Sequence, residues 1–169
     1  IKLNITKRDK SLFFNNIKKN EKKLFKEIEN KSMLVIGGAG TIGSSFIRAA
    51  LKYKPSKLVV VDTNENGLTE LTRRLRSDLK ILVPNEYITY PMSFGSNIFY
   101  KMLNTQGKFD IVANFAAHKH VRSEKDTFSI EAMVINNVLY AKNLLDFLAR
   151  NKPSHFFCVS TDKATNPVN

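Results

Sequence analysis

A chain of 169 residues with 43% hydrophobic content is long and apolar enough to bury the core of one globular domain, which excludes a disordered or fibrous protein. No apolar run approaches the length that spans a membrane and no secretory leader is visible, so we expect a cytoplasmic protein, in which the single cysteine, Cys158, forms no internal disulfide. The net charge of +12 is uneven, because residues 1–31 hold ten Lys and Arg against four Asp and Glu.

The first predicted element is this basic segment, residues 1–31, which we expect to be a helical extension. Between Lys10 and Asn30, apolar residues recur at spacings near three and four with lysines between them, which predicts one or two amphipathic helices. The apolar stripe either packs on the domain or on a neighbouring subunit of a homo-oligomer, or it lies on a membrane surface. The domain that follows is only moderately basic and shows no interleaved aromatic and basic pattern of single-strand binders, so we expect no nucleic-acid partner, and nucleic-acid binding through the basic segment is the alternative.

The next stretch changes from a short apolar run to glycines and is the centre of the predicted domain, residues 32–169. The run Met33–Ile36 is too short for a helix and too continuously apolar for a half-exposed strand, so it predicts a strand buried on both faces. The glycines then let backbone N–H groups and the start of a helix, Thr41–Tyr53, face a phosphate. They fit both G-x-G-x-x-G and G-x-x-G-x-x-G, with the members Gly37, Gly38, Gly40 and Gly43.

A second apolar run decides how this glycine turn is interpreted. An isolated turn of this kind is equally typical of an ordinary tight bend. Here the run Leu58–Val61 follows after one helix and ends in Asp62, 19 residues beyond Gly43. An acid at that place accepts hydrogen bonds from both hydroxyls of a ribose, so the sequence predicts a nucleotide-binding strand–helix–strand unit.

The rest of the chain continues the alternation of helices and strands. The predicted elements are a helix from Asn64 to near Asp78, a strand at Glu86–Tyr90, a helix at Phe94–Leu103, a fourth strand and its exit at Phe109–Ala117, a polar loop at His118–Asp126, a helix at Phe128–Arg150, a fifth strand at His155–Ser160 and a final loop at Thr161–Asn169. This alternation predicts an α/β fold, a Rossmann-type doubly wound parallel sheet of order 3-2-1-4-5.

Three burial predictions follow from the same patterns. Cys158, inside an apolar run, is predicted to be buried in the fifth strand. Two helices are predicted to bury one apolar face each. These faces consist of Ile42, Phe46, Ile47 and Leu51 in the first helix, and of Ile130, Met133, Val134, Val138, Leu144, Leu145 and Leu148 in the helix before the fifth strand.

With these residues in place, the chain resembles the extended short-chain dehydrogenase/reductases, and among them the UDP-N-acetylglucosamine 4,6-dehydratase-like proteins of bacterial polysaccharide biosynthesis. The resemblance runs from about Lys31 to Asn169 and rests on the motifs Gly37–Gly43, Asn114–Asp126 and Ser160–Asn169. It implies an NAD(P)-dependent dehydratase or epimerase that oxidises a UDP-sugar, such as UDP-N-acetylglucosamine, at C4 and eliminates water. The alternative is a catalytically incomplete NAD-binding module.

The resemblance also implies roles for individual residues, most of them where the carboxyl ends of parallel strands meet. The implied cofactor contacts are Gly37, Gly40, Thr41, Ile42, Gly43, Asp62, Ala116, Ala117, Asn137 and Ser160. The implied substrate contacts are Lys119 and Asn166, and the implied catalytic residues are Thr161, Asp162 and Lys163. An adjacent acid and base suit an elimination, although the alternative for Asp162 and Lys163 is a solvent-exposed ion pair.

Some features limit these expectations. Asp62 would repel a 2′-phosphate, so we expect NAD, while Arg73 and Arg74 keep NADP open. His118 and His120 have one residue between them and no third partner, so we expect no metal site. The stretch Tyr90–Gly95 lacks the aspartate that many relatives offer to adenine. The family's next motif, with a tyrosine or methionine and a lysine, and its sugar-binding portion are absent, so we expect a truncated domain.

Overall fold

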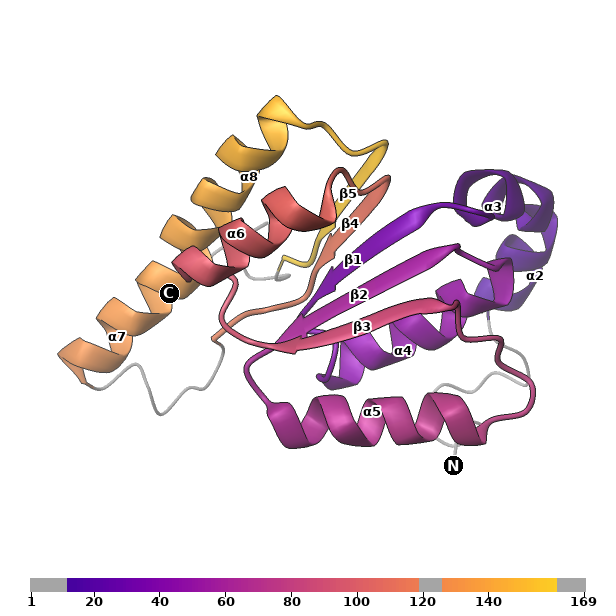
Figure 1. Cartoon of the computed structure of the whole chain (residues 1–169), viewed down its shortest axis with the longest axis horizontal. Coiled ribbons are helices and arrows are strands. Elements are labelled where there is room, and N and C mark those ends of the chain that lie inside the picture. Colours follow the sequence, from indigo (N-terminus) through magenta and orange to yellow (C-terminus); the bar gives the residue numbers. More distant parts are fainter. Residues whose placement is uncertain (1–11, 119–125, 161–169) are drawn as a thin grey trace.

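Five parallel strands form one sheet in the order β3-β2-β1-β4-β5, in a computed structural model that describes residues 12–118 and 126–160 (Figure 1). The strands are β1 (Ser32–Ile36), β2 (Lys57–Asp62), β3 (Glu86–Pro91), β4 (Ile111–Asn114) and β5 (His155–Cys158). β1 pairs with β2 on one side and with β4 on the other, so the direction of winding reverses between β1 and β4. The predicted strand order is confirmed.

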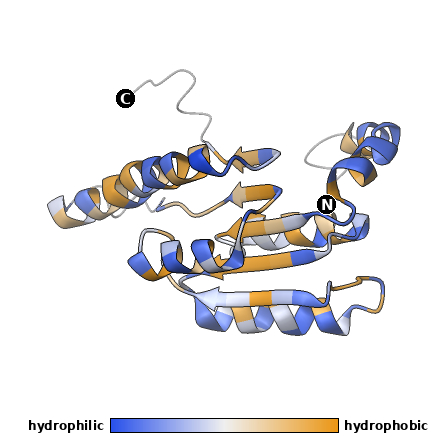
Figure 2. Ribbon diagram, turned by 45° about the horizontal axis from the view of Figure 1, so that its top comes forward, coloured by the Kyte–Doolittle hydropathy of each residue, from blue (hydrophilic) through white to orange (hydrophobic). Residues whose placement is uncertain are grey.

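Helices cover both faces of the sheet (Figure 1). On one face lie α4 (Thr41–Ala50), extended by a 3-10 turn, η1 (Leu51–Tyr53), and α5 (Glu65–Ser77). On the other lie α6 (Asn97–Gln106) and α8 (Tyr140–Arg150). Successive strand residues point to opposite faces, so the apolar runs of β1 and β2 feed both cores, and these strands are hydrophobic along their length in Figure 2.

The segment before β1 forms two helices, α2 (Leu12–Lys19) and α3 (Glu21–Ile28). α3 packs on the domain, because the ring of Phe25 meets that of Tyr53 edge to face at 5.1 Å and Ile28 packs against the core. Glu27 also pairs with His155 of β5 at 2.9 Å. The apolar stripe of the predicted extension therefore contacts the domain along α3. In the parts of the chain that the structure describes, no helix has the length and apolar character needed to cross a membrane.

The predicted helix Phe128–Arg150 is helical but not uniform. α7 (Thr127–Val134) passes into a π-helical segment, η3 (Ile135–Leu139), which passes into α8. The extra residue per turn rotates the side chains that precede it relative to those that follow. The single buried face predicted for this helix is wrong for most of its members, which lie before, within and after the π-helical segment. Leu144 and Leu148 are buried, whereas the exposed members are Ile130, Val134, Val138 and Leu145.

Two other burial predictions are wrong. Cys158 is exposed, because β5 forms the outer edge of the described sheet and every residue of this strand is exposed. Ile42 is 56% exposed, because it lies in the first turn of α4, where the helix leaves the glycine turn before packing along the sheet. The exposure of both residues depends on their position within the sheet or helix, which an apolar sequence pattern does not give.

One polar contact joins the starts of β1 and β4. The backbone N–H and the hydroxyl of Ser32 both donate to Oδ2 of Asp110, at 2.9 and 2.8 Å, and the Asp110 N–H donates to the Ser32 hydroxyl at 3.0 Å. The Ser32 N–H, and with it the Ser32 hydroxyl, holds the pKa of the Asp110 carboxyl below its ordinary value.

We expect Ser32→Ala to lower the free energy of unfolding by about 1 kcal/mol at neutral pH. Because the pKa of Asp110 is depressed in the folded state, this contribution is present above the ordinary carboxyl pKa of about 3.9 and is lost as the pH falls through the folded-state pKa. Urea unfolding of both proteins between pH 7 and strongly acidic pH measures it.

The matched control is Ser45→Ala, whose hydroxyl donates to the carbonyl of Thr41 at 2.7 Å and has no titrating partner. Its difference from the parent protein is expected to be the same at every pH. A Ser32→Ala difference that is equally independent of pH would contradict the assigned role of Asp110.

Candidate functional site

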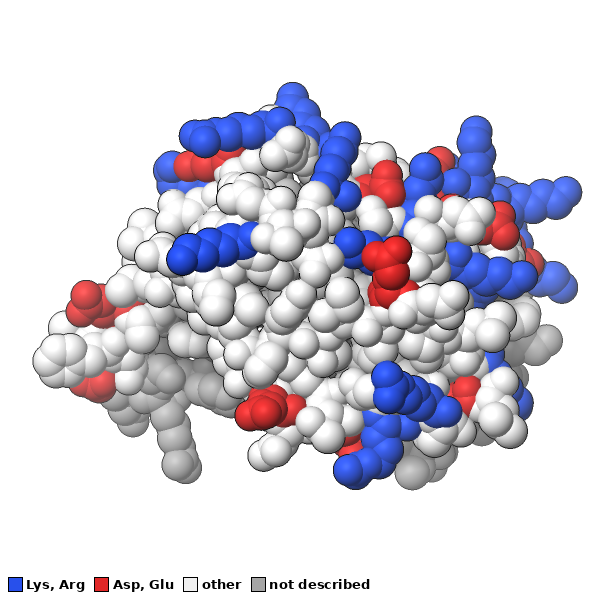
Figure 3. All heavy atoms as spheres, in the orientation of Figure 1, with Lys and Arg blue, Asp and Glu red and all other residues white. Residues whose placement is uncertain are grey.

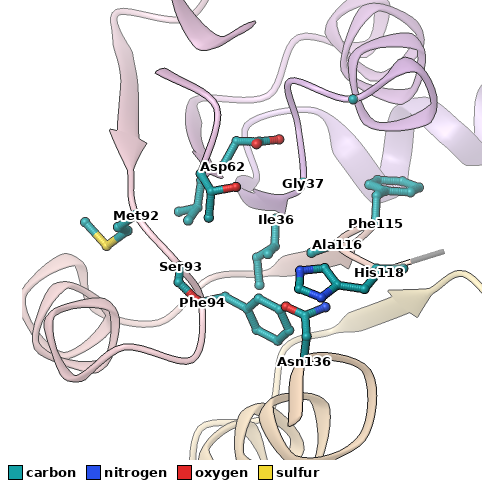
Figure 4. A pocket seen from close by; sticks show the side chains of 14 residues that line it. Ile36, Gly37, Asp62, Met92, Ser93, Phe94, Phe115, Ala116, His118 and Asn136 are labelled. Atoms are coloured by element: carbon teal, nitrogen blue, oxygen red, sulfur yellow. The ribbon is translucent and has the colours of Figure 1, made fainter. Parts of the chain in front are cut away.

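A pocket of about 230 Å³ opens at the carboxyl ends of β1, β2 and β4 (Figure 4). It lies where the winding of the sheet reverses, which is the place where open α/β sheets bind their ligands. Its lining comes from the glycine turn, from the ends of β2 and β3, from the exit of β4 and from the π-helical segment. The lining residues are Ile36, Gly37, Gly40, Val61, Asp62, Thr63, Met92, Ser93, Phe94, Phe115, Ala116, Ala117, His118 and Asn136.

The glycine turn lies directly against the exit of β4. Gly37 has a φ of +74°, and a Cβ on it would lie 2.6 Å from the backbone nitrogen of Ala116. A Cβ on Gly43 would lie 2.3 Å from the carbonyl oxygen of Gly37. The protein's own backbone therefore requires glycine at both positions, so that α4 and β4 can approach the turn.

Gly40 is different, because packing does not require it. A Cβ at this position would meet only the Gly37 carbonyl oxygen, at 3.4 Å, which is an ordinary contact. Gly40 has extended backbone angles, precedes the first turn of α4 and lines the pocket. The space over Gly40 and the free N–H groups at the start of α4 form a cradle that is suited to an anion.

The carboxylate of Asp62 is fixed at the end of β2. Its Oδ2 accepts from the backbone N–H of Ala39, at 2.9 Å, and its Oδ1 accepts from the N–H of Asn64, also at 2.9 Å. Asp62 thus joins the glycine turn to the start of α5, whose first turn is capped by the Asn64 side chain on Gly67 N–H. Each carboxylate oxygen keeps a further lone pair, so Asp62 can still accept from a ligand.

The exit of β4 is held by two asparagines. Asn114, 3% exposed, accepts from the Ala116 N–H at 3.0 Å through its side-chain oxygen. Asn137, in the π-helical segment, accepts from the His118 N–H and donates to the His118 carbonyl, both at 2.8 Å. The Asn137 side chain therefore positions the exit of β4, whereas the neighbouring Asn136 lines the pocket.

The wall on the side of β3 comes from the stretch Tyr90–Gly95, in which the sequence analysis noted a missing aspartate and named no site residue. Met92, Ser93 and Phe94 follow β3 and line the pocket, and Figure 4 shows Phe94 close to Asn136 and His118. The ring of Phe94 packs edge to face on that of Tyr140 at 5.8 Å, which ties this loop to α8. The rule that parallel strands end at one edge would have pointed to these residues as well.

The structure brings together part of the predicted site. Gly37, Gly40, Asp62, Ala116 and Ala117 line one pocket, and Gly43 supports it through close packing. Thr41 and Ile42 begin α4, and Ser160, exposed after β5, does not line this pocket. The other candidates lie outside the described residues, namely Lys119, Thr161, Asp162, Lys163 and Asn166.

Two alternatives raised by the sequence concern positions near the pocket. Arg73 and Arg74 both bind Glu70, at 3.0 and 2.7 Å, on the exposed side of α5, and neither lines the pocket. Within residues 12–118 and 126–160, no group of three or more His, Cys, Asp or Glu side chains is arranged to hold a metal ion. His118 lines the pocket, and His120 lies outside the described residues.

Comparison with known proteins gives the following similarities. Residues 33–169 match the sequence profile of the family described as "Polysaccharide biosynthesis protein". The chain is 30% identical over 146 residues to the capsular polysaccharide biosynthesis protein CapD of Staphylococcus aureus, covering 85% of this chain and 23% of CapD. It is 26% identical to a UDP-N-acetylglucosamine 4,6-dehydratase (inverting) of Campylobacter jejuni, covering 82% of this chain and 39% of the dehydratase.

Among solved structures, the Bordetella bronchiseptica enzyme WbmF in complex with NAD+ superimposes with a TM-score of 0.60 at 19% identity, covering 85% of this chain and 40% of WbmF. At this identity the likeness shows a shared fold. The chain spans less than half the length of each of these relatives.

We expect Gly37→Ala and Gly43→Ala each to lower the free energy of unfolding by about 2 kcal/mol or more, because the new Cβ overlaps backbone atoms that cannot turn away. Gly40→Ala is the matched control and is expected to change it by less than about 1 kcal/mol. Chemical unfolding followed by circular dichroism measures all three. Equal losses at the three positions would mean that Gly40 is also required by packing.

Proposed function

Because the chain belongs to the polysaccharide biosynthesis protein family, we propose that its pocket holds the NAD of a nucleotide-sugar dehydratase or epimerase. The substrate is a UDP-sugar, such as UDP-N-acetylglucosamine. The observation that carries the proposal is the pairing of an unfilled space over Gly40 with a fixed carboxylate at Asp62, in one pocket at the switch point of the sheet.

The residues of the pocket fit a dinucleotide. A pyrophosphate over Gly40 would meet backbone N–H groups and the positive end of α4, with no Cβ in the way. Asp62 would accept from the hydroxyls of the adenosine ribose through its remaining lone pairs. The choice of NAD over NADP is supported by the negative charge of Asp62 and by Arg73 and Arg74, which Glu70 already engages.

The similar proteins support the same chemistry. The C. jejuni relative is named as a dehydratase of UDP-N-acetylglucosamine. The structure of WbmF has been solved in complex with NAD+. When bound, NAD would accept the hydride from sugar C4 and return it to the sugar after water has left, so that the net change is the loss of one water. In the proposed elimination, Lys163 takes the proton from sugar C5 and Asp162 helps water to leave from C6, with Thr161 beside them. Lys119 and Asn166 are the proposed substrate contacts.

A second candidate applies to the chain by itself. The chain spans 23% of CapD and 39% of the dehydratase, so most of the length of these relatives has no counterpart in it. We therefore propose that the 169 residues alone bind NAD without turning over a sugar. The two candidates share the cofactor pocket and differ in catalysis.

We expect NAD to bind the chain with a measurable heat, and Gly40→Ala to weaken binding about tenfold or more, because the new Cβ fills the space of the pyrophosphate and costs its hydrogen bonds. Asp62→Asn is expected to weaken NAD binding about tenfold by removing a charged acceptor.

Calorimetry is the suitable readout for these variants, since the chain has no tryptophan. Glu65→Gln, an exposed change one turn away in α5, is the control and is expected to bind like the parent. Parent-like binding by Gly40→Ala would place the pyrophosphate elsewhere.

The catalytic proposal is tested with a longer protein, in which these 169 residues are followed by a sugar-binding portion like that of the relatives. With NAD and UDP-N-acetylglucosamine, a dehydratase gives a product lighter by one water, whereas an epimerase gives a product of unchanged mass. We expect Lys163→Ala to lower kcat about 100-fold or more, the usual contribution of a positioned base, and Lys152→Ala to leave it unchanged. Release of water at the parent rate by Lys163→Ala would show that Lys163 is not the catalytic base. Turnover of the sugar by the 169 residues alone would contradict the second candidate, in which they only bind NAD.

A further inference from the structure

The second feature of the molecule that points to a ligand is helix α2, at the end of the sheet opposite the pocket. Figure 1 places α2 and α3 beyond the amino ends of the strands. We infer that α2 is a membrane-surface anchor, which inserts its apolar side chains into bilayers that contain anionic phospholipids and is assisted by the lysines of α2 and α3. This role is separate from cofactor binding.

Two apolar side chains of α2 are exposed to solvent. Phe14 and Ile17, three residues apart and therefore on one side of the helix, are 64% and 53% exposed. In the next helix the corresponding residues are covered, since Phe25 packs on Tyr53 and Ile28 packs on the core. The domain thus uses α3 for attachment and leaves Phe14 and Ile17 of α2 exposed.

Five lysines follow these apolar residues at the end of α2 and in α3. The side chains of Lys18 and Lys19 at the end of α2, and of Lys22, Lys23 and Lys26 in α3, are all exposed. Among the described residues, none of these five forms an ion pair with a carboxylate. Figure 3 shows Lys and Arg side chains projecting from this end of the molecule.

The combination of these lysines, unpaired among the described residues, and exposed apolar residues distinguishes among the possible binding partners of α2, which are a protein, a nucleic acid and a lipid bilayer. Lysine is depleted in protein–protein interfaces, because its strongly hydrated ammonium resists burial. Nucleic acid uses positive charge and, when single-stranded, stacks its bases on aromatic rings, but it gives no role to the exposed aliphatic side chain of Ile17. An anionic bilayer uses both, since the apolar side chains enter the acyl boundary while the lysines remain at the phosphate level.

The position of α2 also suits this role. α3 is held to the domain by its packing and by the contact of Glu27 with His155, and the Asn30 N–H donates to the Lys54 carbonyl at 3.0 Å. The glycine turn and Asp62 lie at the other end of the strands. A protein bound to a bilayer through α2 would therefore keep its cofactor pocket open to solution.

The test is binding of the full chain to vesicles, measured by co-sedimentation. We expect binding to phosphatidylcholine vesicles that contain about a quarter phosphatidylglycerol, and weak or no binding to phosphatidylcholine alone. Binding is expected to fall steeply at about 0.5 M NaCl, where charges are screened. Phe14→Glu and Ile17→Glu are each expected to weaken it about tenfold or more, and Lys22→Gln with Lys23→Gln about 20-fold or more.

Matched controls separate anchoring from general effects. Leu79→Glu makes the same kind of change at a fully exposed leucine, and Lys80→Gln with Lys101→Gln removes two exposed lysines elsewhere; both are expected to bind vesicles like the parent. Parent-like thermal unfolding of Phe14→Glu and Ile17→Glu would show that any loss of binding is not due to misfolding.

Three results would overturn the inference. The first is that the parent chain does not bind anionic vesicles. The second is that Leu79→Glu loses binding as much as Phe14→Glu, because the apolar side of α2 would then have no special role. The third is that Phe14→Glu converts a dimer, seen by light scattering, into a monomer while vesicle binding stays unchanged, which would assign this side to a second copy of the chain.

Discussion

The close approach of the glycine turn to the exit of β4 is the constraint on which the rest of the site depends. A side chain at Gly37 would collide with the backbone of Phe115 and Ala116, and Gly43 lies equally close to the Gly37 carbonyl. This contact fixes where α4 begins relative to β4. Asp62 then ties the same turn to the start of α5. On the side of the glycine turn the pocket is thus framed by backbone atoms, whereas the side chains of Met92 and Phe94 line it on the side of β3.

Much of the fold could be predicted because its strongest signals are local. The continuous apolar runs of β1 and β2 indicate strands that are buried on both faces. Their alternation with helices indicates a parallel sheet of the observed strand order. Cys158 and Ile42 were misjudged because burial depends on what lies beside a residue, and an apolar pattern does not show that a strand is at an edge. The π-helical segment was not foreseen, since its residues read as ordinary helix formers.

For the site, the glycines and Asp62 could be predicted from the sequence. The different roles of two adjacent asparagines could not, since Asn137 binds the backbone of His118 whereas Asn136 lines the pocket. Asn136 and Asn137 are indistinguishable in an apolar helix, and their separate directions come from the helical register. Likewise α2 and α3 have similar patterns of apolar residues and lysines, yet Ile28 of α3 packs against the core whereas Phe14 and Ile17 of α2 are exposed. In both cases three-dimensional placement decides which of two chemically equal candidates acts.

The outer edge of β5 has a consequence for handling the protein. Within the described residues β5 hydrogen-bonds to β4 alone, and its Phe156 and Phe157 are 38% and 50% exposed. A strand whose outer backbone groups are unpaired, and which carries aromatic residues, is a template for addition of another strand. Among the described parts of the chain, we therefore expect the outer edge of β5 to be a site where a strand of another copy could add in concentrated samples.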